Sequence, residues 1–236
     1  MRTQWSGLYR WASIMGVALF CAAAHANEQI QQFANAGTPA WQNGNLNSVN
    51  SAYVEGDSIP YRYEITAIPA NGSVIFEMHY DFTKGGQHAL DFQTSYDATE
   101  GGVINSNGGL FGGTPLTTLT TNQLVKKAVA IPDDPTITTD NLLRSLVGTQ
   151  YVSIAGVYTN AFVSTPITLG AGSDTNGDSH KYFAITIQGI TGGQIAIAWG
   201  GHLAVGSLAQ WGLGNGAGSI AGSPFHENGG GTIVGG

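Results

Sequence analysis

Alternating apolar and polar positions predict β-strands along most of this chain. Residues 61–68 (YRYEITAI) alternate aromatic or aliphatic residues with polar ones, which is the period of a strand with one buried face. Residues 73–82 (SVIFEMHYDF) repeat the pattern, and an Asn-Gly turn signal lies between the two segments. The pattern predicts a β-hairpin with Glu64 and Glu77 on its solvent-exposed side.

A second hairpin is predicted nearer the carboxyl end. Residues 181–190 (KYFAITIQGI) and 194–201 (QIAIAWGG) alternate in the same way, and a Thr-Gly-Gly turn separates them. The segments 88–99 and 150–169 predict further strands.

The middle of the chain is less regular. Residues 101–115 (GGVINSNGGLFGGTP) are rich in glycine and predict a loop. Residues 120–131 and 138–148 are short apolar-polar segments that predict brief helices.

The amino-terminal segment has the form of a secretion signal. Arg2 and Arg10 precede or flank an apolar run over residues 11–24, and AHA at 24–26 matches a signal-peptidase site. We expect cleavage after Ala26 and export of the mature chain, because the apolar run is too short for a transmembrane helix. The expected organisation is a signal peptide (1–26), a polar amino-terminal arm that holds at most a helical turn (27–40), one β-sandwich domain (41–226) and a glycine-rich tail (227–236).

Composition favours an all-β fold with many turns. The chain has 35 glycines without a collagen-like period, and only 10% of its residues are charged. Short runs of Val, Ile, Tyr and Phe between turn residues are typical of sandwiches. We therefore expect a single antiparallel β-sandwich, Ig-like or jelly-roll-like, with long glycine-rich loops.

Charge and cysteine usage exclude several partners. The whole chain has a formal charge of −7, and loss of Arg2 and Arg10 makes it more acidic, which argues against binding of nucleic acid or insertion into anionic membranes. The one cysteine, Cys21, lies in the expected signal peptide. The mature chain is therefore predicted to lack disulfides, zinc–thiolate sites and cysteine nucleophiles.

Four polar residues form a predicted structural cluster. His202 follows a strand and two glycines in AWGGHLA (198–204), and His88, Asp91 and His226 lie in loop-like segments. Buried polar groups of this kind usually brace loops by hydrogen bonds. The alternative is a metal site, since imidazole and carboxylate are the ligands available without thiols, although the spacing matches no local metal motif.

Residues 173–180 (SDTNGDSH) are a candidate calcium loop. Asp174, Asn176 and Asp178 alternate, as the first oxygen ligands of calcium loops do. The later glutamate of an EF-hand is missing, because Ile185 stands in its place. Ca²⁺ is thus a candidate cofactor of this loop, and a polar Asx-turn loop without metal is the alternative.

Trp41 and Trp211 are candidate glycan contacts, because both lie in segments rich in glycine and asparagine and planar rings stack on sugars. The alternative is that they close the ends of the sandwich. No G-x-S-x-G nucleophile elbow occurs, and we predict no enzymatic activity.

Several motifs occur in a recognisable order: WQNGNLNSVNSAYVEGDSIPYRYEI, YDFTKGGQHALDF, IPDDP and IAWGGHLA followed by GAGSIAGSPFH. Together they resemble a recurrent module of large bacterial secreted and cell-surface, adhesin-like proteins, over about residues 41–226. The resemblance implies an extracellular β domain and no catalytic residues.

The expected function is accordingly that of a secreted, non-enzymatic module of a bacterial surface or extracellular matrix, structural or adhesive. Its expected partners are other extracellular proteins or surface glycans, and glycan binding by exposed aromatic residues is the alternative function. Self-association by strand addition through TIV (232–234) in the tail is a further hypothesis.

Overall fold

The computed structural model describes residues 29–106, 110, 126–134, 137, 148–170, 179–207, 211–221 and 227–235; the predicted signal peptide lies outside them. Almost all of the regular structure in this part of the chain is strand, apart from the short helix α1 (Gly101–Ser106) and the 3-10 turn η2 (Ala217–Ser219). The strands are β1 (Gln29–Ala34), β2 (Ala40–Gln42), β3 (Ser58–Ile65), β4 (Gly72–Lys84), β5 (Gln87–His88), β6 (Leu90–Thr94), β7 (Lys126–Ala130), β8 (Tyr151–Val157), β9 (Asn160–Leu169), β10 (Ser179–Leu203) and β11 (Glu227–Val234).

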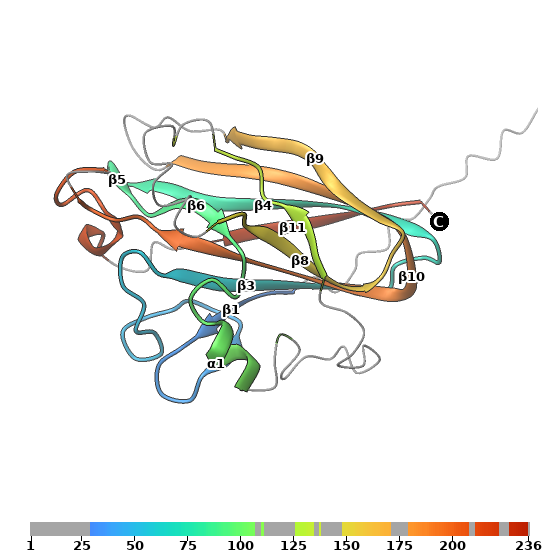
Figure 1. Ribbon diagram of the computed structural model, residues 1–236, viewed down its shortest axis with the longest axis horizontal. Coiled ribbons are helices and arrows are strands. Elements are labelled where there is room, and N and C mark those ends of the chain that lie inside the picture. Colours follow the sequence, from blue (N-terminus) through green and yellow to red (C-terminus); the bar gives the residue numbers. More distant parts are fainter. Residues whose placement is uncertain are drawn as a thin grey trace, which may run out of the picture.

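The long strand β10 passes through both layers of the fold. Its first half pairs with β4 and β9, and its second half pairs with β3, β6 and β8. Between the halves, Gly189, Gly192 and Gly193 have φ values of 62°, 94° and 76°, which glycine adopts without the steric cost of a side chain. The chain therefore folds over at this point, and β10 returns in the second layer (Figure 1).

Each half of β10 lies within one layer of a continuous antiparallel sheet. In the layer that we call the first sheet, the strands lie in the order β11, β4, β10 and β9, and β5 pairs with β4. In the second sheet, β3 joins β10 to β1 and β2, while β6 and β8 pair with the other edge of β10 and β7 pairs with β8. The predicted all-β, sandwich-like fold is confirmed.

The two predicted hairpins are wrong in their pairing. β3 and β4 follow each other along the chain, but both pair with β10 and neither pairs with the other. The two halves of β10 likewise pair with different partners in different layers. Each predicted hairpin is therefore an arch that spans the sandwich. Alternation alone does not separate the two arrangements, because both turn the apolar face toward the same core.

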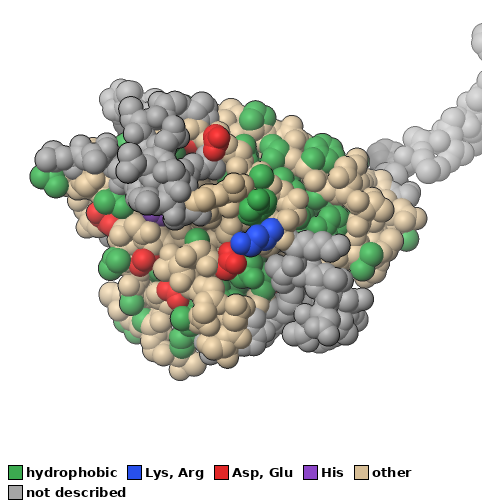
Figure 2. Space-filling model, viewed as in Figure 1, with side chains coloured by type: hydrophobic (Ala, Val, Ile, Leu, Met, Phe, Trp, Pro, Cys, Tyr) green, Lys and Arg blue, Asp and Glu red, His purple; other side chains and the backbone are tan. Residues whose placement is uncertain are grey.

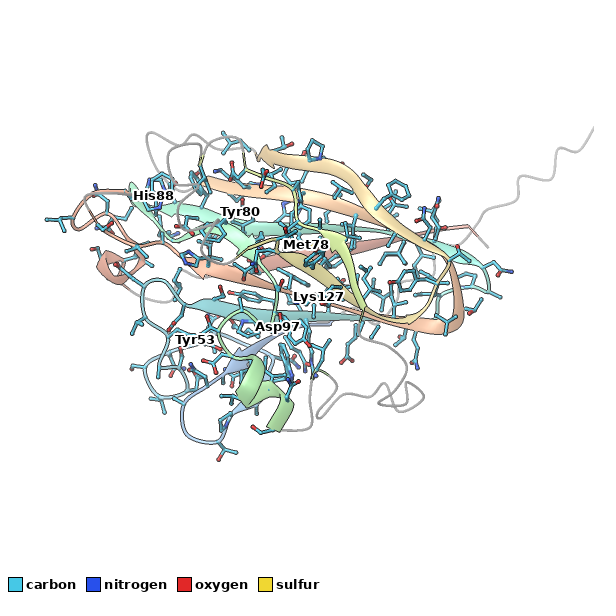
Figure 3. All side chains as sticks on the ribbon, in the orientation of Figure 1. Tyr53, Met78, Tyr80, His88, Asp97 and Lys127 are labelled. Atoms are coloured by element: carbon cyan, nitrogen blue, oxygen red, sulfur yellow. The ribbon has the colours of Figure 1, made fainter. Side chains whose placement is uncertain are left out.

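The core lies between the two sheets and is built from the alternating residues. Phe76 of β4 contacts Tyr63 of β3 and Trp199 of β10, with ring centroids 4.6 and 5.4 Å apart, and Met78 and Tyr80 of β4 also lie between the layers (Figure 3). Burial of one such large side chain contributes about 1.5–3 kcal/mol. The predicted inward face of β4 is confirmed: its five apolar residues are all buried.

The opposite face of β3 is also buried, contrary to the prediction that it is solvent-exposed. A small second cluster covers it and includes Phe33 of β1, Ile104 of α1 and Leu110. Arg62 is buried beneath this cover, donates to the Leu110 carbonyl at 2.6 Å and lies 3.8 Å from Glu64. The sequence showed the polar residues of this face, but not the distant segments that cover them.

Both chain ends of the described part are strands rather than an arm and a tail. β1 pairs with β2 and β3 in the second sheet, so the expected helical turn in 27–40 is wrong. The glycine-rich β11 pairs with β4 along its whole length. In the middle of the chain, β7 replaces the helix expected over 120–131, and α1 begins in the expected glycine loop. Residues 138–147 lie outside the described part.

Charged side chains are sparse on the face shown in Figure 2, where uncharged groups dominate. This agrees with the low content of charged residues in the chain. No helix in the described part of the chain is long and apolar enough to cross a membrane.

Candidate functional site

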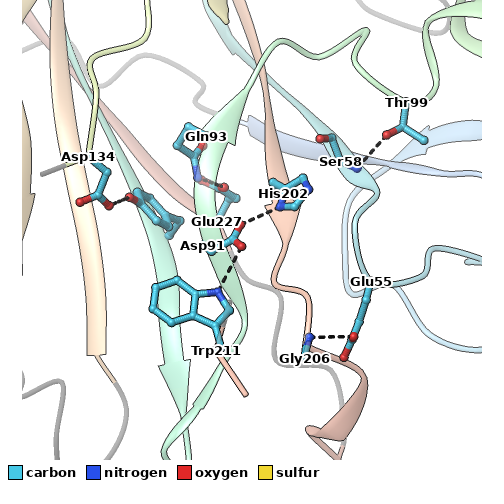
Figure 4. Close-up of polar contacts among 11 residues, drawn as sticks. Glu55, Ser58, Asp91, Gln93, Thr99, Asp134, His202, Gly206, Trp211 and Glu227 are labelled. Atoms are coloured by element: carbon cyan, nitrogen blue, oxygen red, sulfur yellow. Dashed lines mark hydrogen bonds and ion pairs between the residues drawn. The ribbon is translucent and has the colours of Figure 1, made fainter. Parts of the chain in front are cut away.

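Three of the four residues of the predicted polar cluster lie in one connected group, and Figure 4 shows two of them, Asp91 and His202, together with Trp211. His202 of β10 lies with its Nδ1 2.7 Å from Asp91 Oδ1, and the Trp211 indole N–H donates to Asp91 Oδ2 at 3.2 Å. The Trp211 ring also stacks on His88, with centroids 3.7 Å apart. The fourth residue, His226, lies outside the described residues.

This group has the form of a structural brace. Asp91 and His202 are buried, both oxygens of Asp91 have partners, and the His202 ring stacks on Phe92 with centroids 4.2 Å apart. Nearby, Glu55 accepts hydrogen bonds from the Gly206 and Gly218 amides at 2.9 and 2.8 Å, which fixes the loops after β10. Each of these polar groups already has a partner, as buried groups require.

The two tryptophans predicted to contact glycans both pack against protein groups. Trp41 is partly buried, with Phe33 edge-on at 5.3 Å and the Arg62 guanidinium 4.6 Å from its ring. Trp211 is partly buried between Phe82 and His88 and uses its N–H for Asp91. Each ring covers part of the fold, as in the alternative interpretation in which the tryptophans close the ends of the sandwich, and glycan contact by either one stays a prediction.

The predicted calcium ligands Asp174, Asn176 and Asp178 lie outside the described residues, and Ca²⁺ binding there stays a prediction. Among the residues that the structure does describe, no group of three or more His, Cys, Asp or Glu is arranged to hold a metal ion.

A hollow on the outer face of the first sheet is the candidate binding site. We call it the shelf, and it is lined by Glu77, His79, Tyr80, Asp81, His180, Asn228, Gly229 and Gly230. Its volume is about 400 Å³, which is within the range of small-ligand sites. The strands β4, β10 and β11 supply these residues from three distant parts of the chain.

His79 forms the wall of the shelf. It lies on β4 opposite Tyr182 of β10 on one side and Asn228 of β11 on the other. The His79 ring stacks on Tyr182, with centroids 4.9 Å apart and planes within 14°. The His180 ring, which also lines the shelf, lies beside His79 with its centroid 5.7 Å away.

Glycine forms the floor of the shelf. The outward position on β11 beside Glu77 is Gly230, and a Cβ built there meets nothing within 4 Å. The adjacent Gly229 and Gly231 instead face the core, where an added Cβ lies 2.8 Å from Phe76 and Ile65 respectively. Glycine therefore lets β11 pack closely on its inner side and leaves the outer side open.

Carboxylates and an amide complete the shelf. Glu77 and Asp81 flank His79 on the outward face of β4, and Asn228 faces His79 from β11. Glu77 Oε2 lies 3.1 Å from His79 Nε2 and its side chain is 52% exposed, which confirms its predicted surface position. The outward position of these residues follows from the alternation of β4, but the contribution of β11 does not.

Glu227, at the start of β11, carries a buried carboxyl group that the sequence pattern did not predict. It accepts hydrogen bonds from the Gln93 side-chain amide at 2.8 Å and the Trp199 indole at 3.2 Å. Burial raises the pKa of Glu227 to about 8, although the two hydrogen bonds act in the opposite direction. The tail was expected to lie outside the domain, so its one acidic residue gave no signal of burial.

Comparison of the chain with protein-family models, with curated proteins and with solved structures gave no match. The functional assignment therefore depends on the geometry of the shelf and its chemistry.

Proposed function

We propose that this protein is a non-enzymatic adhesive module of a bacterial extracellular surface, and that it contacts surface glycans through the shelf. The supporting observation is the His79 ring, which stacks on Tyr182 and lines the shelf beside its glycine floor, with Glu77, Asp81 and Asn228 around it. A flat ring face packs against the apolar face of a sugar. Carboxylate and amide groups accept or donate hydrogen bonds to its hydroxyls.

The rest of the fold suits a rigid support for such contacts. The shelf lies on three paired strands whose inner faces carry the core, and sites on regular elements hold their geometry better than sites on loops. Trp41 and Trp211, the earlier candidates, serve in this proposal to close the fold. Export and a surface location are part of the proposal and follow from the predicted signal peptide.

A panel of immobilised glycans, probed with the purified chain in EDTA, tests the proposal. EDTA removes metal-bridged retention that would otherwise involve His79 and His180. We expect retention on a subset of glycans, and about fivefold weaker binding by His79→Ala, since one ring contact is worth about 1 kcal/mol. Gly230→Phe should abolish retention by filling the hollow, because the position has room for a side chain.

The matched control is Phe162→Ala, which removes an exposed ring on β9 that does not line the shelf. It should leave glycan retention unchanged. If Gly230→Phe melts like the wild type and still binds glycans equally well, the shelf is not the site. If the wild-type chain is retained on no glycan, the proposed function is wrong.

A further inference from the structure

A lysine and an aspartate touch in the interior, on the opposite side of β4 from the shelf. Lys181 Nζ lies 2.8 Å from Asp134 Oδ2, and each side chain is 1% exposed. Lys181 is on β10 directly across from Tyr80 of β4. Its Nζ lies 3.3 Å from the centroid of the Phe82 ring. The two groups thus meet in a site lined by aromatic rings.

The Lys181–Asp134 contact is held away from water. Removing both an ammonium and a carboxylate from water is costly. Transfer of one proton from Lys181 Nζ to Asp134 Oδ2, along the existing contact, removes both charges at once. The products are a neutral amine and a carboxylic acid, which are a nucleophile and an electrophile held at contact distance.

We propose that Lys181 and Asp134 form an intramolecular amide (isopeptide) bond in the folded protein. The Nζ lone pair adds to Asp134 Cγ to form the N–C bond, and the bond from Cγ to one carboxyl oxygen breaks with its electron pair. Two protons leave Nζ in all, and both end on the departing oxygen. One water is released, and the reaction needs no oxidant, reductant or cofactor.

Tyr80 is placed to assist this reaction as a catalytic residue. Its phenol donates a hydrogen bond to Asp134 Oδ2 at 3.3 Å. Burial, followed by the nearby Asp134 carboxylate, raises the pKa of Tyr80 well above its ordinary value, so the phenol keeps its proton. It can therefore stabilise charge that develops on the carboxyl oxygen and relay a proton to the leaving water.

The bond would join the two layers of the sandwich. Asp134 follows β7, which belongs to the second sheet, whereas Lys181 lies in the half of β10 that belongs to the first sheet. The chain contains a single cysteine, so no disulfide within the chain can serve this purpose. The inference does not depend on glycan binding by the shelf.

Mass spectrometry of the folded, purified full chain tests the proposal. We expect a mass lower by about 18 Da, one water, than the sequence requires. Trypsin gives the decisive evidence, because it does not cut after a lysine whose amine is acylated. The peptide 128–144, which contains Asp134, should remain attached to a peptide that runs through Lys181 to the end of the chain.

Two variants separate bond formation from folding. Lys181→Met combined with Asp134→Ala removes both reacting groups without leaving a lone buried charge, and it should show the full mass and normal cleavage. Tyr80→Phe should slow formation of the bond at least tenfold. Full mass in the wild type, with separate peptides ending at Arg144 and Lys181 after prolonged incubation of folded protein, would overturn the proposal.

Discussion

β3 and β4 carry the same alternation of apolar and polar residues, yet their surroundings differ. β3 is buried at all eight of its positions, whereas β4 buries the apolar residues of its inner face and leaves most residues of its outer face partly or fully exposed. The second face of β3 is covered by the amino-terminal strands and the cluster around α1. The outer face of β4 instead lies beside Gly230 of β11, where an added Cβ would meet nothing within 4 Å. Alternation thus identifies the two faces of a strand, but not whether a distant segment covers the second one.

The stability of the protein should be most sensitive to the loss of a polar group on the covered face of β3. Arg62→Ala leaves Glu64 buried without its cation and leaves the Leu110 carbonyl without its donor. We expect a loss of about 3–5 kcal/mol in the free energy of unfolding, as for other broken buried pairs. Urea denaturation of the variant and of the wild type measures this loss.

The matched variant on β4 is Glu77→Ala, which should change stability by no more than about 0.5 kcal/mol because the side chain is exposed. Equal effects of the two substitutions would show that the cover over β3 contributes little in solution.

Glu227, which is buried on the inner face of the β4–β11 pair, should make the free energy of unfolding depend on pH. Glu227 has a pKa of about 8 in the folded chain against an ordinary value of 4.5, so the folded state holds a proton that the unfolded state releases between these values. The bound proton therefore adds to the free energy of unfolding in full below about pH 4.5, and this added stability is lost as the pH rises through about 8. Because protonation and folding are linked, the free energy of unfolding should fall by a few kcal/mol at most over this pH range.

Glu227→Gln removes this titration and should flatten the fall in stability between about pH 5 and pH 8, measured by urea denaturation at several pH values. Because burial also raises the pKa of Glu64, a residual slope of the same sign is expected. An unchanged pH profile in the variant would mean that Glu227 is not buried as described.

Substitutions at the three consecutive glycines of β11, residues 229–231, allow the two faces of one strand to be compared. Gly229→Ala and Gly231→Ala each place a Cβ 2.8 Å from a buried side chain, and such overpacking costs about 1–3 kcal/mol. Gly230→Ala points into open space and should be nearly neutral. Thermal melting of the three variants measures the difference, and a destabilised Gly230→Ala would contradict the open floor of the shelf.

The smallest expected effect is that of His79→Ala on stability. The ring is partly exposed and stacks on Tyr182, so its removal should cost less than about 1 kcal/mol. Calorimetry of this variant beside Phe162→Ala would detect a larger loss, which would assign His79 a structural role in place of a binding role.

Strand positions and inward faces could be predicted because local alternation carries them. The inner residues of β4, the apolar residues of both halves of β10, and two strands within 150–169 all follow from a period of two. The same period, extended back from Phe183, places Lys181 on the inner face. Burial of this lysine could therefore have been predicted from the sequence. Asp134, its partner, comes from an irregular segment that no periodicity places.

By itself, the sequence determined the all-β class and the faces of the main strands, because these depend on short-range pattern. Only the tertiary structure decided that the expected hairpins are arches, that the polar face of β3 is buried, and that the glycine-rich tail is a strand. It also brought Lys181 to Asp134 and Asn228 to His79. The physical reason is common to all of them: pairing and coverage between distant segments depend on the total area that the fold can bury, and no local pattern encodes that sum.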